Sequence, residues 1–107
     1  MDDASAHWSR IETEREFADA FAGKTFVGDG IVFTLHADGR ITGTVGTARL
    51  QGNWYWRGGY FCRTATLEGE DLGLDCEIIE KRPGEMRYTR DKGAGERSVV
   101  SIRSDSV

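Results

Sequence analysis

The stretch that decides the fold is residues 31–45, which read IVFTLHADGRITGTV. Apolar residues alternate with others on both sides of Asp38-Gly39, the pattern of two strands that each bury one face. Asp38-Gly39 marks the turn of a β-hairpin. A register in which paired residue numbers sum to 76 places Leu35 opposite Ile41 and Ile31 opposite Val45. The apolar faces of the two predicted strands then coincide.

The same two-residue period continues along the rest of the chain. Further strands are predicted at 50–56, 60–66, 72–78, 85–91 and 97–103, and an eighth if 25–28 is counted. Because the connections are short, consecutive strands are expected to be antiparallel neighbours. Closing such a meander into a barrel pairs its first and last strands and leaves no exposed edge strand. The fold class is therefore mainly β: an N-terminal helix and a seven- or eight-stranded antiparallel meander. This meander forms a small barrel or, alternatively, a strongly curved sheet.

Two glycines predict the next register. If paired numbers sum to 95, Gly52 lies opposite Gly43, and the gap that they leave is filled by a neighbouring ring, with Trp54 and Phe33 as candidates.

The helix precedes the strands. It is predicted to begin at Ser9, which forms a capping box with Glu12, and to end before Gly23. Phe17 and Phe21 fall on its apolar face and are expected to dock on the core. Residues 1–8 are predicted to form a disordered N-terminal segment, 9–103 a single helix-plus-β-meander domain, and 104–107 a frayed tail.

Length and charge limit the classes of protein. The chain has 107 residues and a formal net charge of −4. This length predicts one domain, and the acidic balance argues against a nucleic-acid partner. No segment approaches the ~20 apolar residues of a membrane span. The first eight residues, MDDASAHW, lack the basic and apolar regions of a complete signal peptide, so the protein is cytoplasmic or has lost a leader.

The cysteines predict a disulfide. A register that sums to 138 places Cys62 opposite Cys76 and Thr64 opposite Leu74 in the 60–78 hairpin, within disulfide range. Closing about 15 residues contributes roughly 3 kcal/mol in the chain-entropy model. The alternative is two buried free thiols. A metal site is not expected, because the spacing fits no zinc site. A disulfide favours an oxidising compartment, hence a periplasmic or secreted protein if a leader was removed, and otherwise a cytoplasmic one.

Aromatic side chains supply the candidate binding residues. The segment 52–63, GNWYWRGGYFCR, contains five of them. Ligand-binding candidates are Trp54, Trp56, Tyr60 and Tyr88; the alternative is that the first three simply form the barrel core. Tyr55 and Phe61 have the opposite parity and are expected outside or under the helix, where an exposed pair would be an interface candidate.

Charged residues give no clear site. The acidic run Glu68, Glu70, Asp71, Asp75, Glu77 and Glu80 predicts either a cation site or basic partner, or a solvated loop and outer strand face. Arginines at 57, 63, 82, 87 and 90 can offset it across neighbouring strands. No catalytic constellation is present, and Gly93-Ala94-Gly95 is not a dinucleotide fingerprint. We therefore expect no catalytic residues and no cofactor.

The segments 37–41, 52–63, 71–73 and 91–95 carry a family resemblance. Together they resemble a family of small exported bacterial proteins that often bear the name dihydrodipicolinate reductase. The resemblance implies export, and the name implies a nicotinamide-dependent enzyme. The chain has no glycine-rich βα turn to hold that cofactor's pyrophosphate.

These observations predict a non-enzymatic β module that binds an apolar small ligand or a protein partner in the cell envelope. One alternative is an envelope inhibitor or interaction protein that acts through an acidic surface. A further alternative is an enzyme, including the reductase that the family name implies.

Overall fold

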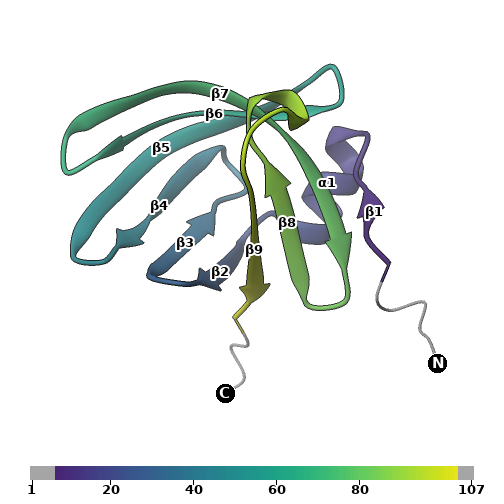
Figure 1. The fold of residues 1–107 in the computed structure, drawn as a ribbon, viewed down its shortest axis with the longest axis horizontal. Coiled ribbons are helices and arrows are strands. Elements are labelled where there is room, and N and C mark those ends of the chain that lie inside the picture. The colour runs from purple at the N-terminus through teal and green to yellow at the C-terminus, as the bar shows by residue number, and fades with distance from the viewer. Residues whose placement is uncertain (1–6, 104–107) are drawn as a thin grey trace.

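The computed structural model describes residues 7–103; the predicted tail and most of the predicted disordered segment lie outside them. The described chain is a closed antiparallel barrel of eight strands, with one helix and an extra strand (Figure 1). Along the chain the elements are β1 (Ser9–Arg10), α1 (Glu14–Phe21), β2 (Lys24–Gly28), β3 (Ile31–Leu35), β4 (Arg40–Val45), β5 (Ala48–Arg57), β6 (Tyr60–Leu67), β7 (Glu70–Arg82), β8 (Glu85–Thr89), a 3₁₀ turn (Asp91–Gly93) and β9 (Arg97–Ile102). Consecutive strands from β2 to β9 pair with each other, and pairing of β2 with β9 closes the barrel.

The predicted start of the helix is wrong. Thr13, and not Ser9, is the N-cap: its hydroxyl accepts a hydrogen bond from the Glu16 N–H at 3.1 Å, and the Glu16 carboxylate accepts one from the Thr13 N–H at 3.2 Å. Ser9 and Arg10 instead form β1, which pairs with β7. Backbone pairing with a distant strand thus overrides a local capping signal.

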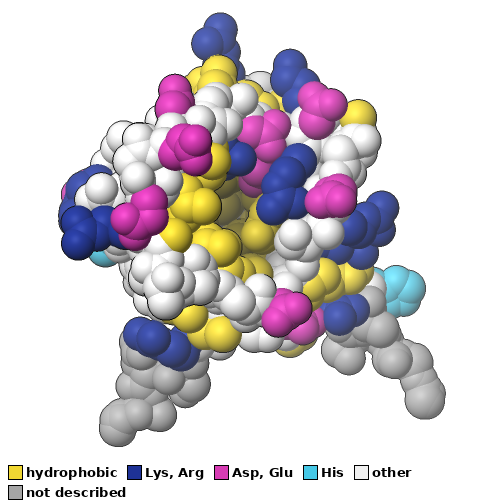
Figure 2. Space-filling model, turned by 60° about the vertical axis from the view of Figure 1, so that its left-hand side comes forward, with side chains coloured by type: hydrophobic (Ala, Val, Ile, Leu, Met, Phe, Trp, Pro, Cys, Tyr) yellow, Lys and Arg dark blue, Asp and Glu magenta, His cyan; other side chains and the backbone are white. Residues whose placement is uncertain are grey.

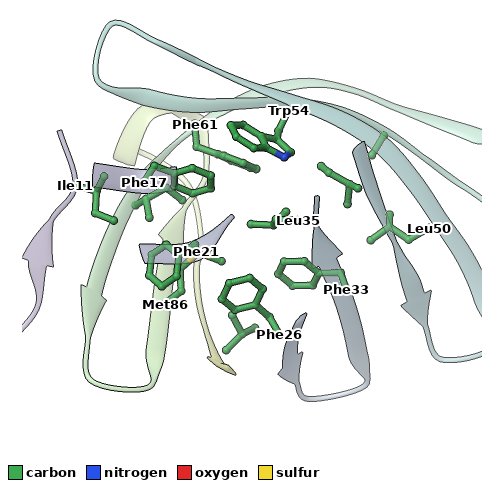
Figure 3. Close-up of a cluster of buried hydrophobic side chains, with 14 residues drawn as sticks. Ile11, Phe17, Phe21, Phe26, Phe33, Leu35, Leu50, Trp54, Phe61 and Met86 are labelled. Carbon is green, nitrogen blue, oxygen red and sulfur yellow. The ribbon is translucent and has the colours of Figure 1, made fainter. Parts of the chain in front are cut away.

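The predicted docking of the helix is confirmed. Phe17 is completely buried, and its ring lies 5.0 Å from Trp54 and 5.1 Å from Phe61, measured between centroids. Figure 3 shows Phe17 and Phe21 pointing from α1 into the same cluster as these rings. The helix ends where predicted, because Gly23 follows with a φ of 81°, which favours glycine.

The register of the first hairpin is confirmed, and the next one is corrected. Leu35 lies opposite Ile41, but Gly43 lies opposite Leu50 and not opposite Gly52. The glycines do not create a gap for a ring. A Cβ atom on Gly43 would lie 2.1 Å from the Val32 carbonyl oxygen, so the backbones of β3 and β4 approach each other too closely for any side chain there. Such glycines mark the sharp bends at which a small barrel closes.

The disulfide is present. Cys62 lies opposite Cys76 and Thr64 opposite Leu74, and the two sulfurs are bonded. After Ala65 the register shifts by one residue, because Ala65 pairs with Gly73 and Thr66 with Asp71. This bulge bends the end of the β6–β7 hairpin. A disulfide is typical of proteins from an oxidising, extracellular environment.

The inward face is formed by the odd-numbered residues of β6 and, from Gly73 onward, of β7, whereas Leu72, the unpaired residue of the bulge, also lines the interior. Gly58 and Gly59 form a two-residue turn that places Arg57 opposite Tyr60 and Trp56 opposite Phe61. Phe61 therefore shares the inner face with Trp56, and the disulfide lies on the outer side of the sheet. Leu74, on the same outer side, is 60% exposed.

Candidate functional site

A cavity of about 300 Å³ lies inside the barrel. Its walls are mostly apolar side chains from β3 to β8: Ile31, Phe33, Leu35, Ile41, Val45, Leu50, Phe61, Ala65, Leu72, Ile79, Met86 and Tyr88. Protein interiors are close-packed, and voids larger than a water molecule are few. A cavity of this volume is within the range of small-molecule sites, at its lower end.

The cavity opens to solvent on the side of the β4–β5 and β6–β7 hairpin tips. Figure 2 shows this side of the molecule, with a hydrophobic hollow at the centre and charged side chains around it. On the other side, Phe17 and Phe21 of α1 pack into the core. Leu72 both lines the cavity and is 48% exposed, which places it at the mouth.

Three charged side chains also line the cavity: Arg63 of β6, Glu77 of β7 and Arg90, which follows β8. We call these residues the polar wall, because they come from adjacent strands on one side of the barrel. Glu77 is only 3% exposed, although charged residues are rarely buried without partners.

The bulge in β7 holds Arg63. The Nη1 of Arg63 donates a hydrogen bond of 3.0 Å to the carbonyl oxygen of Gly73, which follows the unpaired Leu72 and has a φ of 80°. Its Nε lies 3.8 Å from Oε2 of Glu77, and its Nη2 lies 4.0 Å from Oδ2 of Asp75. Both ion-pair distances exceed those of hydrogen bonds.

The burial of Glu77 raises the pKa of its carboxyl group to about 8. Desolvation is the main cause, and a hydrogen bond with Asp75 raises the pKa further, while the positive charges of Arg63 and Arg90 lower it. Glu77 is therefore mostly protonated at neutral pH. Asp75 also accepts a hydrogen bond from the Asp91 N–H at 3.0 Å.

Arg90 lies over an aromatic ring. Its guanidinium carbon is 5.2 Å from the ring centre of Tyr88, and its Nη1 donates to Oγ of Ser98 at 3.3 Å and to the carbonyl oxygen of Glu96 at 3.5 Å. The Tyr88 ring itself packs edge-on against Phe33, with centroids 6.3 Å apart. Tyr88 thus joins the apolar cavity to the polar wall.

The structure separates the four ligand-binding candidates. Only Tyr88 lines the cavity. Trp54 is a core residue whose indole N–H donates to the carbonyl oxygen of His36 at 3.0 Å. Trp56 stacks on Phe17 with centroids 5.4 Å apart. Tyr60 points away from the cavity, beneath the guanidinium of Arg10.

The two interface candidates are also separated. Tyr55 is exposed on the outer face, as expected. Phe61 lies under the helix, which was one of its two predicted positions, and is buried against Phe17. The two residues therefore form no joint exposed patch.

The acidic run does not form one surface, because Asp75 and Glu77 turn inward while Glu80 pairs with Arg87 on the outside at 2.8 Å. Sequence reasoning missed Arg63, Glu77 and Arg90 as site residues. The one available signal was the two-residue turn at Gly58-Gly59, which fixes the inward parity of β6.

Comparison of the chain with known protein families, with curated proteins and with solved structures finds no match. Between residues 7 and 103, no helix has the length and apolar character that a membrane span requires. No cluster of three or more potential metal ligands occurs in that same part of the chain.

Proposed function

We propose that this protein is a non-enzymatic binding module that holds a small apolar ligand inside its barrel. The observation that carries the proposal is the apolar cavity of about 300 Å³ with a mouth at the hairpin tips. Side chains usually fill a barrel of eight strands, or leave room for one small ligand. Here the helix contributes its rings to one side of the core, and the other side stays hollow.

The proposed location is the periplasm or the extracellular space. The Cys62–Cys76 disulfide supports it, because such bonds persist in oxidising compartments. The disulfide links β6 to β7, which both line the cavity, so it also supports the shape of the binding site.

The test is titration of the uncharged amphiphile 1-octanol into ¹⁵N-labelled protein, followed by amide chemical shifts. We expect saturable shifts in the strands that line the cavity. Leu72→Trp narrows the mouth and should weaken binding at least about tenfold, because the indole takes up space that the ligand needs. Leu74→Trp is the matched control, with the same substitution two residues away on the exposed outer face.

Two results would contradict the proposal. One is shifts that grow linearly with 1-octanol and spread over the outer surface. The other is equal weakening of binding by both tryptophan variants, which would mean that the mouth beside Leu72 is not the entrance.

A further inference from the structure

The cavity has two chemically different sides. The strands β3, β4 and β5 contribute only apolar side chains to it, among them Phe33, Ile41 and Leu50. The side formed by β6, β7 and the end of β8 contributes the polar wall, Arg63, Glu77 and Arg90. A ligand that fills this space meets hydrocarbon on one side and guanidinium groups on the other.

The polar wall has an excess of positive charge. Arg63 and Arg90 bring two guanidinium groups, and both lower the pKa of Glu77 electrostatically, so the three side chains lie close together. Asp75 pairs with Arg63 at 4.0 Å, whereas Glu77 is only 3% exposed and, with a pKa of about 8, mostly carries a proton at neutral pH. A partly buried guanidinium without an equal counter-charge is costly, and a ligand anion removes that cost.

The guanidinium groups also have unused donors. Of the five N–H groups of Arg63, one donates to Gly73, and the carboxylates of Glu77 and Asp75 lie beyond hydrogen-bond distance. The hydrogen bonds of Arg90 are long, at 3.3 and 3.5 Å. No described residue forms a hydrogen bond with the hydroxyl group of Tyr88. These groups can therefore accept an anion without breaking strong bonds within the protein.

We propose that the ligand is an amphiphile with one negative charge, a monocarboxylate whose headgroup binds Arg63 and Arg90 and whose apolar chain lies against β3, β4 and β5. This inference rests on the proposed function and specifies its ligand class. Guanidinium groups bind carboxylates through two parallel hydrogen bonds, which suits such a headgroup. A cavity of 300 Å³ holds about ten non-hydrogen atoms at about 30 Å³ each, the size of octanoate.

The test compares octanoate, 1-octanol and octylamine by calorimetric titration at pH 6.5. We expect octanoate to bind at least about tenfold more tightly than 1-octanol, because charge-assisted hydrogen bonds add to the same apolar contact. Octylamine, which is positively charged at this pH, should bind more weakly than 1-octanol.

Equal binding of octanoate and 1-octanol, or tighter binding of octylamine, would overturn the headgroup assignment and leave the proposed function standing. Absence of binding by all three would overturn both.

Variants localise the headgroup. Arg90→Gln and Arg63→Gln should each weaken the binding of octanoate at least about tenfold more than the binding of 1-octanol. Arg87→Gln is the matched control, since Arg87 loses the same charge on the outer face, where it pairs with Glu80. Retained 1-octanol binding shows that a variant is folded, and two arginines are tested so that one misfolded variant does not end the test. Unchanged octanoate binding in a folded variant at both positions would overturn the proposal.

Discussion

The buried carboxyl group of Glu77 makes a prediction about stability and pH. Its pKa is about 8 in the folded protein against 4.5 for the ordinary group. The folded state therefore favours the protonated form, and the stabilisation is fully present below pH 4.5 and lost as the pH rises to 8. A difference of one bound proton between the folded and unfolded states changes the free energy of unfolding by about 1.4 kcal/mol for each pH unit. Over this window the folded protein therefore loses on the order of 5 kcal/mol of stability.

Glu77→Gln isolates this contribution, because glutamine is uncharged and can still donate to Asp75. Urea unfolding at pH 5, 6, 7, 8 and 9 should show that the variant gains stability over the natural protein by about 1.4 kcal/mol per pH unit up to pH 8, and then levels off. Glu80→Gln is the control. The pKa of Glu80 is lowered, chiefly by the hydrogen bond with Arg87, so the difference in stability between this variant and the natural protein should be constant from pH 6 to 8.

A constant difference between Glu77→Gln and the natural protein over pH 5–8 would refute the reasoning. It would mean that Glu77 is ionised at neutral pH and that the polar wall carries no excess positive charge.

Three further predictions concern the barrel itself. Reduction of the Cys62–Cys76 disulfide should lower the free energy of unfolding by about 3 kcal/mol, measured with urea with and without a reductant, and no change would contradict it. Phe17→Ala should cost about 3–5 kcal/mol in the same assay, because the ring is fully buried among other rings; a cost below that of an exposed substitution would show that the helix is not docked. Gly43→Ala should destabilise the protein by about 1–3 kcal/mol or more through the clash with Val32, whereas an unchanged melting temperature would refute the close approach of β3 and β4.

The strands and two registers could be predicted from the sequence because the patterns that encode them are local. Residues 31–45 combine an alternating apolar face, which gives the register, with a turn pair, which marks where the chain reverses. Cys62 and Cys76 fit the same pairing as the residues around them. The predicted β4–β5 register is wrong because Gly43 and Gly52 do not face each other: Gly43 allows the close approach of β3, and Gly52 that of β6.

The inward face of β6 differs from the expectation for a physical reason. The sequence pattern places Tyr60 with Trp54 and Trp56, but the turn at Gly58-Gly59 puts Phe61 opposite Trp56, so Phe61 and not Tyr60 faces the core. The outward position of Leu74 follows from the same parity, because Leu74 lies opposite Thr64. Exposed apolar residues are common on small proteins and are weak indicators of orientation.

The polar wall could not be predicted because it depends on closure of the barrel. Arg63, Glu77 and Arg90 lie far apart in sequence, and charged residues on strands are normally solvated. The inward positions of Arg63 and Glu77 follow from parity in β6 and β7, and Gly73, next to the bulge, supplies the carbonyl group that holds Arg63. The helix start failed for a similar reason, since pairing of β1 with β7 is a tertiary contact.

The measurement that tests the central claim most directly is the position of bound octanoate. Intermolecular nuclear Overhauser effects with ¹³C-labelled octanoate should connect its chain to Ile41 and Leu50 and place its carboxylate end beside Arg63. Contacts from the chain to Tyr55 and Leu74 on the outer face, with none to the cavity, would contradict the account.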